Sequence, residues 1–213
     1  MGTISQGILG GVSGKVGNVI GGSWKGIDYL RIMPASIANP KTAAQMDQRS
    51  KFVTVLNFLQ PMVELLRVGF KLYSIKMTQF NSAMSYHLKN AITGLYPDYS
   101  IDYSKVLISR GALTKADGTS VTSPLEAQVV VSWADNTGSG EAAATDKALI
   151  AIVDENNGEA VYAIAGSTRS GGSLTLNLPG NFSGDEVHAY LGFVSEDGRA
   201  VASSVYVGST TAT

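Results

Sequence analysis

The second half of the chain alternates apolar and polar side chains, and this pattern constrains the fold more than any other feature. From Tyr99 onward it predicts seven short β-strands, at residues 104–110, 127–134, 147–154, 160–165, 173–178, 186–195 and 199–207. Turn-forming pairs such as Asp117-Gly118 and Asp197-Gly198 stand between the runs. Seven short strands within about 105 residues are typical of a β-sandwich.

Four segments near the end of this half are informative: residues 176–179 (Leu-Asn-Leu-Pro), 187–190 (Val-His-Ala-Tyr), 195–198 (Ser-Glu-Asp-Gly) and 203–206 (Ser-Ser-Val-Tyr). Together they resemble the last three strands of a fibronectin type III or immunoglobulin-like module. In this comparison Trp133 takes the position of the core tryptophan. Because the chain has no cysteine, it lacks the disulfide of an immunoglobulin domain, and the fibronectin version fits better. The resemblance implies an adhesive or spacing role by analogy.

In residues 39–98 the apolar residues recur at the spacing of a helix instead. Asn39-Pro40 is a typical helix start, and the residues from Thr42 to Gln45 form an alternative capping box. A second helix begins at Pro61, and a third is predicted over residues 78–92, with Gly94 ending it. We expect two or three helices that pack as a small bundle.

Residues 1–38 contain nine glycines among valine, isoleucine, leucine and tryptophan residues. A helix does not tolerate this density, because each glycine costs about 1 kcal/mol relative to alanine. The alternation predicts extended strands in a hairpin that turns near residues 21–23 (Gly-Gly-Ser). An isolated hairpin is marginally stable in water, so this one needs a partner, either its own helices or another subunit.

Charge and composition also bear on association. Charged residues make up 15% of the chain, against roughly 25% in a typical soluble domain, which favours a protein that covers part of its surface with other subunits. Residues 1–98 hold ten basic and four acidic residues, whereas residues 99–213 hold six and thirteen, giving net charges of +6 and −7. This segregation fits either two differently charged domains or head-to-tail attraction between subunits.

No constellation for catalysis or cofactor binding emerges from the motifs. The glycines match neither the dinucleotide fingerprint nor the P-loop, and His87 and His188 stand alone. Calcium ligands in a loop and a stacking platform for sugars or bases are alternatives to ordinary polar and packing roles. The residues concerned are, for calcium, Asp135, Asn136, Glu141 and Asp146, and for stacking, Tyr96, Tyr99 and Tyr103. We therefore predict a non-enzymatic protein with no catalytic, cofactor or metal residues.

The first half combines several distinctive motifs: Gly14-Lys-Val-Gly17, Trp24-Lys-Gly26, Tyr29-Leu-Arg31, and an Asn39-Pro-Lys-Thr42 helix start followed by Gln45 and Arg49. Over residues 7–110 this combination resembles an uncharacterised domain-of-unknown-function family found in bacteria and their phages. The family carries no assigned activity, so the resemblance implies no catalytic residue. It implies an association with phage-like or surface-assembled proteins.

Together these observations predict an α+β protein with three segments: a Gly-rich β-hairpin for assembly at 1–38, a helical region at 39–98 and a fibronectin III-like β-sandwich at 99–213. The expected function is that of a structural subunit that self-assembles into an extracellular filament or a phage-like particle. In this hypothesis the N-terminal segment adds to a neighbouring copy by strand pairing. The expected interface residues are Val12, Val16, Val19, Ile20 and Trp24.

The alternative is an adhesive module whose sandwich loops bind a carbohydrate or a cell-surface partner. We expect a homo-oligomer, no specific nucleic-acid partner because the basic residues form no run, and no membrane span because no apolar run is long enough. The sequence has no evident cleavable signal peptide. An extracellular assembly or a virion is the favoured location.

Overall fold

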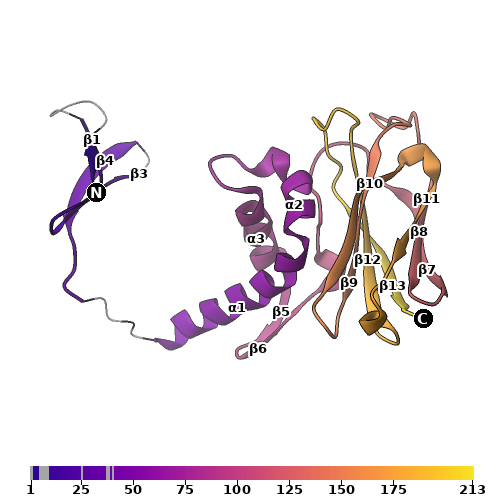
Figure 1. Ribbon diagram of the computed structural model, residues 1–213, viewed down its shortest axis with the longest axis horizontal. Coiled ribbons are helices and arrows are strands. Elements are labelled where there is room, and N and C mark those ends of the chain that lie inside the picture. The colour runs from indigo at the N-terminus through magenta and orange to yellow at the C-terminus, as the bar shows by residue number, and fades with distance from the viewer. Residues whose placement is uncertain (1, 5–9, 25, 37–38, 40) are drawn as a thin grey trace. The chain divides into compact units, whose positions relative to one another are not determined.

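The computed structural model describes residues 2–4, 10–24, 26–36, 39 and 41–213. The chain divides into two compact units, Met1–Thr42 (unit 1) and Ala43–Thr213 (unit 2), drawn in Figure 1. The helical region and the sandwich differ in the spacing of their apolar residues, but they belong to one unit. Pro40, part of the expected helix start, lies outside the described residues.

Unit 1 is a four-stranded antiparallel sheet in the order β1-β2-β3-β4. Its strands are β1 (Thr3–Ile4), β2 (Val12–Val16), β3 (Val19–Trp24) and β4 (Ile27–Ile32). The turn expected at residues 21–23 is wrong, because β2 and β3 join at Gly17-Asn18 instead, where Gly17 has a φ of 58°. Gly21 lies inside β3, where a Cβ atom would stand 1.9 Å from the carbonyl oxygen of Val12. The glycine therefore permits close backbone packing and does not form a turn.

Unit 2 begins with a helical layer. It contains α1 (Ala43–Leu59), α2 (Val63–Gly69) and α3 (Gln79–Asn90), with 3-10 turns η1 (Gln60–Met62) and η2 (Lys71–Tyr73) between them. α1 starts directly after Thr42, and Thr78 caps α3 by accepting a hydrogen bond from the backbone N–H of Asn81 at 3.2 Å. Gly94 does not end α3: the helix stops at Asn90, and Gly94 lies in the hairpin of β5 (Ile92–Leu95) and β6 (Asp98–Ile101).

The sandwich contains two antiparallel sheets, of order β10-β9-β12-β13 and β11-β8-β7. The strands are β7 (Asp117–Leu125), β8 (Gln128–Ala134), β9 (Lys147–Asp154), β10 (Ala160–Thr168), β11 (Ser173–Asn177), β12 (Glu186–Val194) and β13 (Val205–Thr211). This seven-stranded arrangement is of the fibronectin type III kind, as predicted.

Two strand predictions are wrong. Residues 104–110 form no strand, because they include the 3-10 turn η3 (Tyr103–Lys105) and then an irregular segment whose backbone N–H groups at Ile108 and Ser109 donate to the hydroxyl of Ser204. The last strand begins at Val205 rather than at residue 199. The seventh strand of the sandwich is instead β7, which begins at Asp117-Gly118, a pair that was expected to be a turn between strands.

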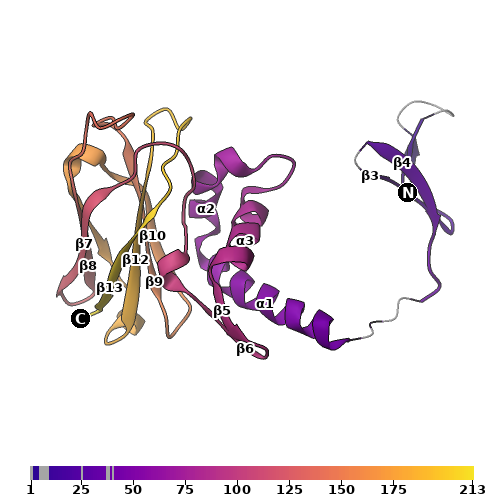
Figure 2. The same cartoon turned by 180° about the vertical axis from the view of Figure 1, so that it is seen from behind.

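Unit 2 has three layers, the helices and the two sheets of the sandwich, and β9 contacts both of its neighbouring layers. Ala148, Ile150 and Ile152 belong to the core between the two sheets, whereas Leu149, Ala151 and Val153 belong to a second core beneath the helices. Successive side chains of a strand point to opposite faces, so a continuous apolar run is needed where both faces are covered. The helices therefore cover the outer face of the four-stranded sheet, opposite the three-stranded sheet (Figures 1 and 2).

The helical layer supplies many of the fully buried side chains of this second core: Val55, Leu59, Met62, Leu65, Leu66 and Phe70. By length and composition Ala43–Gly69 is apolar enough to cross a membrane, and 39% of that window is buried. Core helices share these properties: Val55, Leu59, Leu65 and Leu66 are buried in the second core, whereas Phe52 and Val53 are 48% and 50% exposed.

Candidate assembly interface

The sheet of unit 1 exposes large apolar side chains. All six residues of β4 are exposed, including Ile27 at 66%, Leu30 at 61% and Ile32 at 79% of full accessibility. Among the described residues of unit 1 whose burial is assigned, Gly21 alone is buried. Fully burying one such side chain stabilises a fold by about 1.5–3 kcal/mol. Among the described residues of unit 1 no large apolar side chain is fully buried, and Val12 and Ile20 are partly buried.

The register of the strands divides the predicted interface residues between two faces. Val16 pairs with Val19, and Val19 pairs with Ile32, so these three share one face. By the two-residue alternation Val12 belongs to this face as well. Ile20 and Trp24 belong to the opposite face, where Trp24 pairs with Ile27. Of the five, Trp24 is the most exposed, at 63%, followed by Val16 at 56%, while Val12 and Ile20 are partly buried.

The sequence analysis missed β4 as a candidate surface. It is the last strand in the sheet order, so within the described residues one of its edges pairs with β3 and the other pairs with no strand. An unpaired edge presents a row of backbone N–H and C=O groups that can pair with a further strand. The signal in the sequence is the short run Ile-Asp-Tyr-Leu-Arg-Ile at residues 27–32, in which four of six residues are apolar and both faces of a strand carry apolar side chains.

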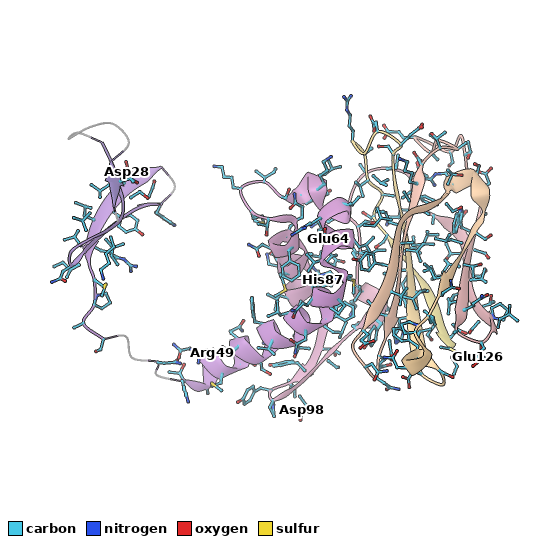
Figure 3. All side chains as sticks on the ribbon, in the orientation of Figure 1. Asp28, Arg49, Glu64, His87, Asp98 and Glu126 are labelled. Carbon is cyan, nitrogen blue, oxygen red and sulfur yellow. The ribbon has the colours of Figure 1, made fainter. Side chains whose placement is uncertain are left out.

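A hollow of about 410 Å³ is formed by residues at the start of β2 and in the middle of β4. It is lined by Gly10, Gly11, Val12, Asp28, Tyr29 and Leu30. A Cβ atom on Gly11 would stand 2.0 Å from a carboxylate oxygen of Asp28, so this glycine leaves room for the Asp28 side chain. Asp28 is the labelled acidic residue of unit 1 in Figure 3.

The loop acids that were considered as calcium ligands already have a cation among them. Arg169, which the sequence analysis did not single out, is fully buried, and its Nε atom lies 3.0 Å from Oδ2 of Asp146. The same guanidinium donates to Oδ1 of Asn136 at 2.7 Å. Asp135 accepts from Thr137, which lowers the pKa of the Asp135 carboxyl group, and Glu141 is exposed. Among the described residues no group of three His, Asp or Glu side chains is arranged to hold a metal ion.

The two histidines occupy separate packing environments. His87 is fully buried on α3 (Figure 3), where its Nδ1 donates to the carbonyl oxygen of Ala83 at 2.8 Å and its Nε2 accepts from the N–H of Leu107 at 3.3 Å. Burial lowers the pKa of His87 from 6.5 to about 4, so the ring is neutral near pH 7. His188 stacks on Tyr103 with ring centres 3.8 Å apart, and its Nε2 lies 3.3 Å from Oε2 of Glu155.

The linker tyrosines hold structural elements together. Tyr99 donates to the carboxylate of Asp47 on α1, and burial raises the pKa of Tyr103 to about 12. Tyr96 is half exposed in the turn between β5 and β6. Every aromatic residue from 99 to 213 is buried or partly buried, so the sandwich loops lack the exposed aromatic side chains that would favour glycan binding.

The chain belongs to a family of unknown function, DUF6266, whose model matches residues 11–208. Its C-terminal half resembles a fibronectin type III domain in the number and pairing of its strands. A similar solved structure is the fn3 domain of the human collagen alpha-1(XX) chain, with 10% identity and a TM-score of 0.37 over 49% of this chain and 90% of that one. No curated protein matches the sequence.

Proposed function

We propose that this protein is a non-enzymatic structural subunit that self-assembles, in an extracellular filament or a phage-like particle, through the sheet of unit 1. The observation that supports this most is the contrast between the two units. Unit 2 buries a core on both faces of its central sheet, whereas unit 1 exposes Val16, Trp24, Ile27, Leu30 and Ile32. Sheets that expose this much apolar surface are typical of interfaces.

The proposed contact combines strand addition and apolar packing. The edge of β4 that pairs with no described strand pairs with a strand of a neighbouring copy, and main-chain hydrogen bonds supply the affinity. The apolar faces of the sheet are covered in the same step. A contact between different surfaces of two copies propagates as an open chain unless its rotation closes a ring. This explains why low charge and an N-terminal sheet without a core occur in one molecule.

Two isoleucines of equal exposure provide a matched test. Ile32 in β4 is 79% exposed, and Ile75, in the loop before α3, is 78% exposed. If Ile32 becomes buried on assembly, Ile32→Lys removes about 2 kcal/mol of apolar burial per contact, which weakens the dissociation constant roughly 30-fold. Ile75→Lys adds the same charge elsewhere and leaves association unchanged.

Sedimentation velocity over a series of protein concentrations measures this difference. We expect the unmodified chain and Ile75→Lys to sediment as larger species when concentrated, and Ile32→Lys to shift toward the monomer. The proposal fails if the unmodified chain is monomeric throughout the series, or if the two lysine variants associate equally. Circular dichroism of both variants establishes that unit 2 remains folded.

A further inference from the structure

Unit 2 carries a surface with the composition of an anion-binding site. Its residues lie far along the chain from the proposed assembly strands of unit 1. It is a hollow of about 400 Å³ along α3 and the preceding loop. Its lining includes Tyr73, Met77, Ser85, Tyr86, Lys89 and Arg110. A volume of this size falls within the range of small-molecule sites.

Arg110 is held in place from both its side chain and its backbone. Its guanidinium carbon lies 4.4 Å from the ring centre of Tyr73 and 5.6 Å from that of Tyr86. Its backbone N–H donates to the carbonyl oxygen of Gly69 at 2.9 Å. A Cβ atom on Gly69 would stand 2.1 Å from the carbonyl oxygen of Ile108, so only glycine allows the segment before Arg110 to approach α2 this closely.

The two basic side chains of the hollow lack acidic partners. No Asp or Glu lines it, and among the described residues neither Lys89 nor Arg110 lies within 4.0 Å of a carboxylate. Three other arginines of unit 2 differ in this respect, since Arg67, Arg169 and Arg199 each have a carboxylate neighbour. The guanidinium group of Arg110 lies over the rings of Tyr73 and Tyr86, and its N–H groups are the hydrogen-bond donors that it offers to a ligand.

We propose that this hollow binds a small organic anion, whose carboxylate or phosphate group is held by Arg110 and Lys89 and whose ring lies against Tyr73 and Met77. Guanidinium groups bind both oxyanions with paired hydrogen bonds, and lysine adds a point charge. Tyr73 and Met77 are 42% and 49% exposed and form an apolar rim. Ser85 and Tyr86 are further residues of the lining, and the hydroxyl group of Tyr86 donates to the carbonyl oxygen of Lys105 at 3.4 Å. This site does not depend on assembly through unit 1.

Isothermal titration calorimetry of the full chain tests the site with four probes: benzoate, phenyl phosphate, inorganic phosphate and benzyl alcohol. We expect saturable binding of the two aryl anions and none of benzyl alcohol, which keeps the ring without the charge. Tighter binding of phenyl phosphate than of benzoate identifies phosphate as the preferred group, and the reverse identifies carboxylate. Inorganic phosphate that binds as tightly as phenyl phosphate overturns the ring contact, and the absence of saturable binding of both aryl anions overturns the site.

Variants assign the binding to these side chains. Arg110→Gln is expected to weaken aryl-anion binding at least tenfold, and Lys89→Gln by a smaller factor. Arg110→Lys keeps the charge and is expected to bind between the unmodified chain and Arg110→Gln. Arg199→Gln, which removes an exposed arginine outside the hollow, serves as the matched control and keeps full affinity. Unchanged affinity in a folded Arg110→Gln variant, or an equal loss in Arg199→Gln, contradicts the proposal.

Discussion

The buried imidazole of His87 predicts a specific loss of stability in mild acid. Its Nδ1–H donates to the carbonyl oxygen of Ala83, and its Nε2 accepts from the N–H of Leu107. Protonation of Nε2 would place two N–H groups against each other inside the helical core. Burial also disfavours the charged form of the ring, and it lowers the pKa of His87 from 6.5 to about 4.

The sign and size of the effect follow from proton linkage. The unfolded chain takes up the proton near pH 6.5, whereas the folded chain does so only near pH 4, so the unfolding free energy falls as the pH falls through this window. Each unit of difference corresponds to about 1.4 kcal/mol, which gives about 3 kcal/mol across the window. The stability is fully present above pH 6.5 and has been lost near pH 4.

Urea unfolding at pH 7 and at pH 4.5, for the unmodified chain and for His87→Gln, measures this contribution. Glutamine does not titrate, and its amide supplies a donor and an acceptor in place of the two ring nitrogens. We expect the unmodified chain to lose about 2–3 kcal/mol more than the variant between the two pH values. Equal losses in the two proteins would refute the reasoning.

Two further predictions concern the packing of unit 2. Gly69→Ala places a Cβ atom 2.1 Å from the carbonyl oxygen of Ile108 and should lower the unfolding free energy by about 1–3 kcal/mol, while Gly180→Ala, with no atom within 4 Å, should be nearly neutral in urea unfolding. Asp146→Ala leaves the guanidinium of Arg169 buried without its carboxylate and should cost about 3–5 kcal/mol, measured as a lower thermal midpoint. A cost below 1 kcal/mol would mean that solvent reaches the guanidinium.

The local sequence pattern predicted a strand correctly where the distribution of apolar residues alone was sufficient. The run at residues 147–154 is β9 with the same bounds, because valine, isoleucine, leucine and alanine on both faces fit only a covered central strand. β7 was missed because its residues, Asp-Gly-Thr-Ser-Val-Thr-Ser-Pro-Leu, are mostly turn formers, and pairing with β8 overrides that preference. The apolar side chains at 149, 151 and 153 already required a second covering layer, which the helices provide.

Features that depend on contacts between distant residues could not be predicted from the local sequence. The glycines at 21 and 22 resemble a turn until the neighbouring strand is in place, and then Gly21 proves to be a point of close contact. The ion pair of Asp146 and Arg169 joins residues 23 positions apart, and no local spacing signals it. Of the expected interface residues, the pairing of Val16 with Val19 follows from a short turn between adjacent strands, whereas the placement of Ile20 and Trp24 on the other face depends on the register.

The central claim is that copies of this chain assemble through the sheet of unit 1. Negative-stain electron microscopy combined with light scattering of the purified full-length protein, at increasing concentration, tests it most directly. The proposal predicts regular particles or filaments and a mass that rises with concentration. A single species with the mass of one 22.3 kDa chain at every concentration, and no ordered particles, would contradict it.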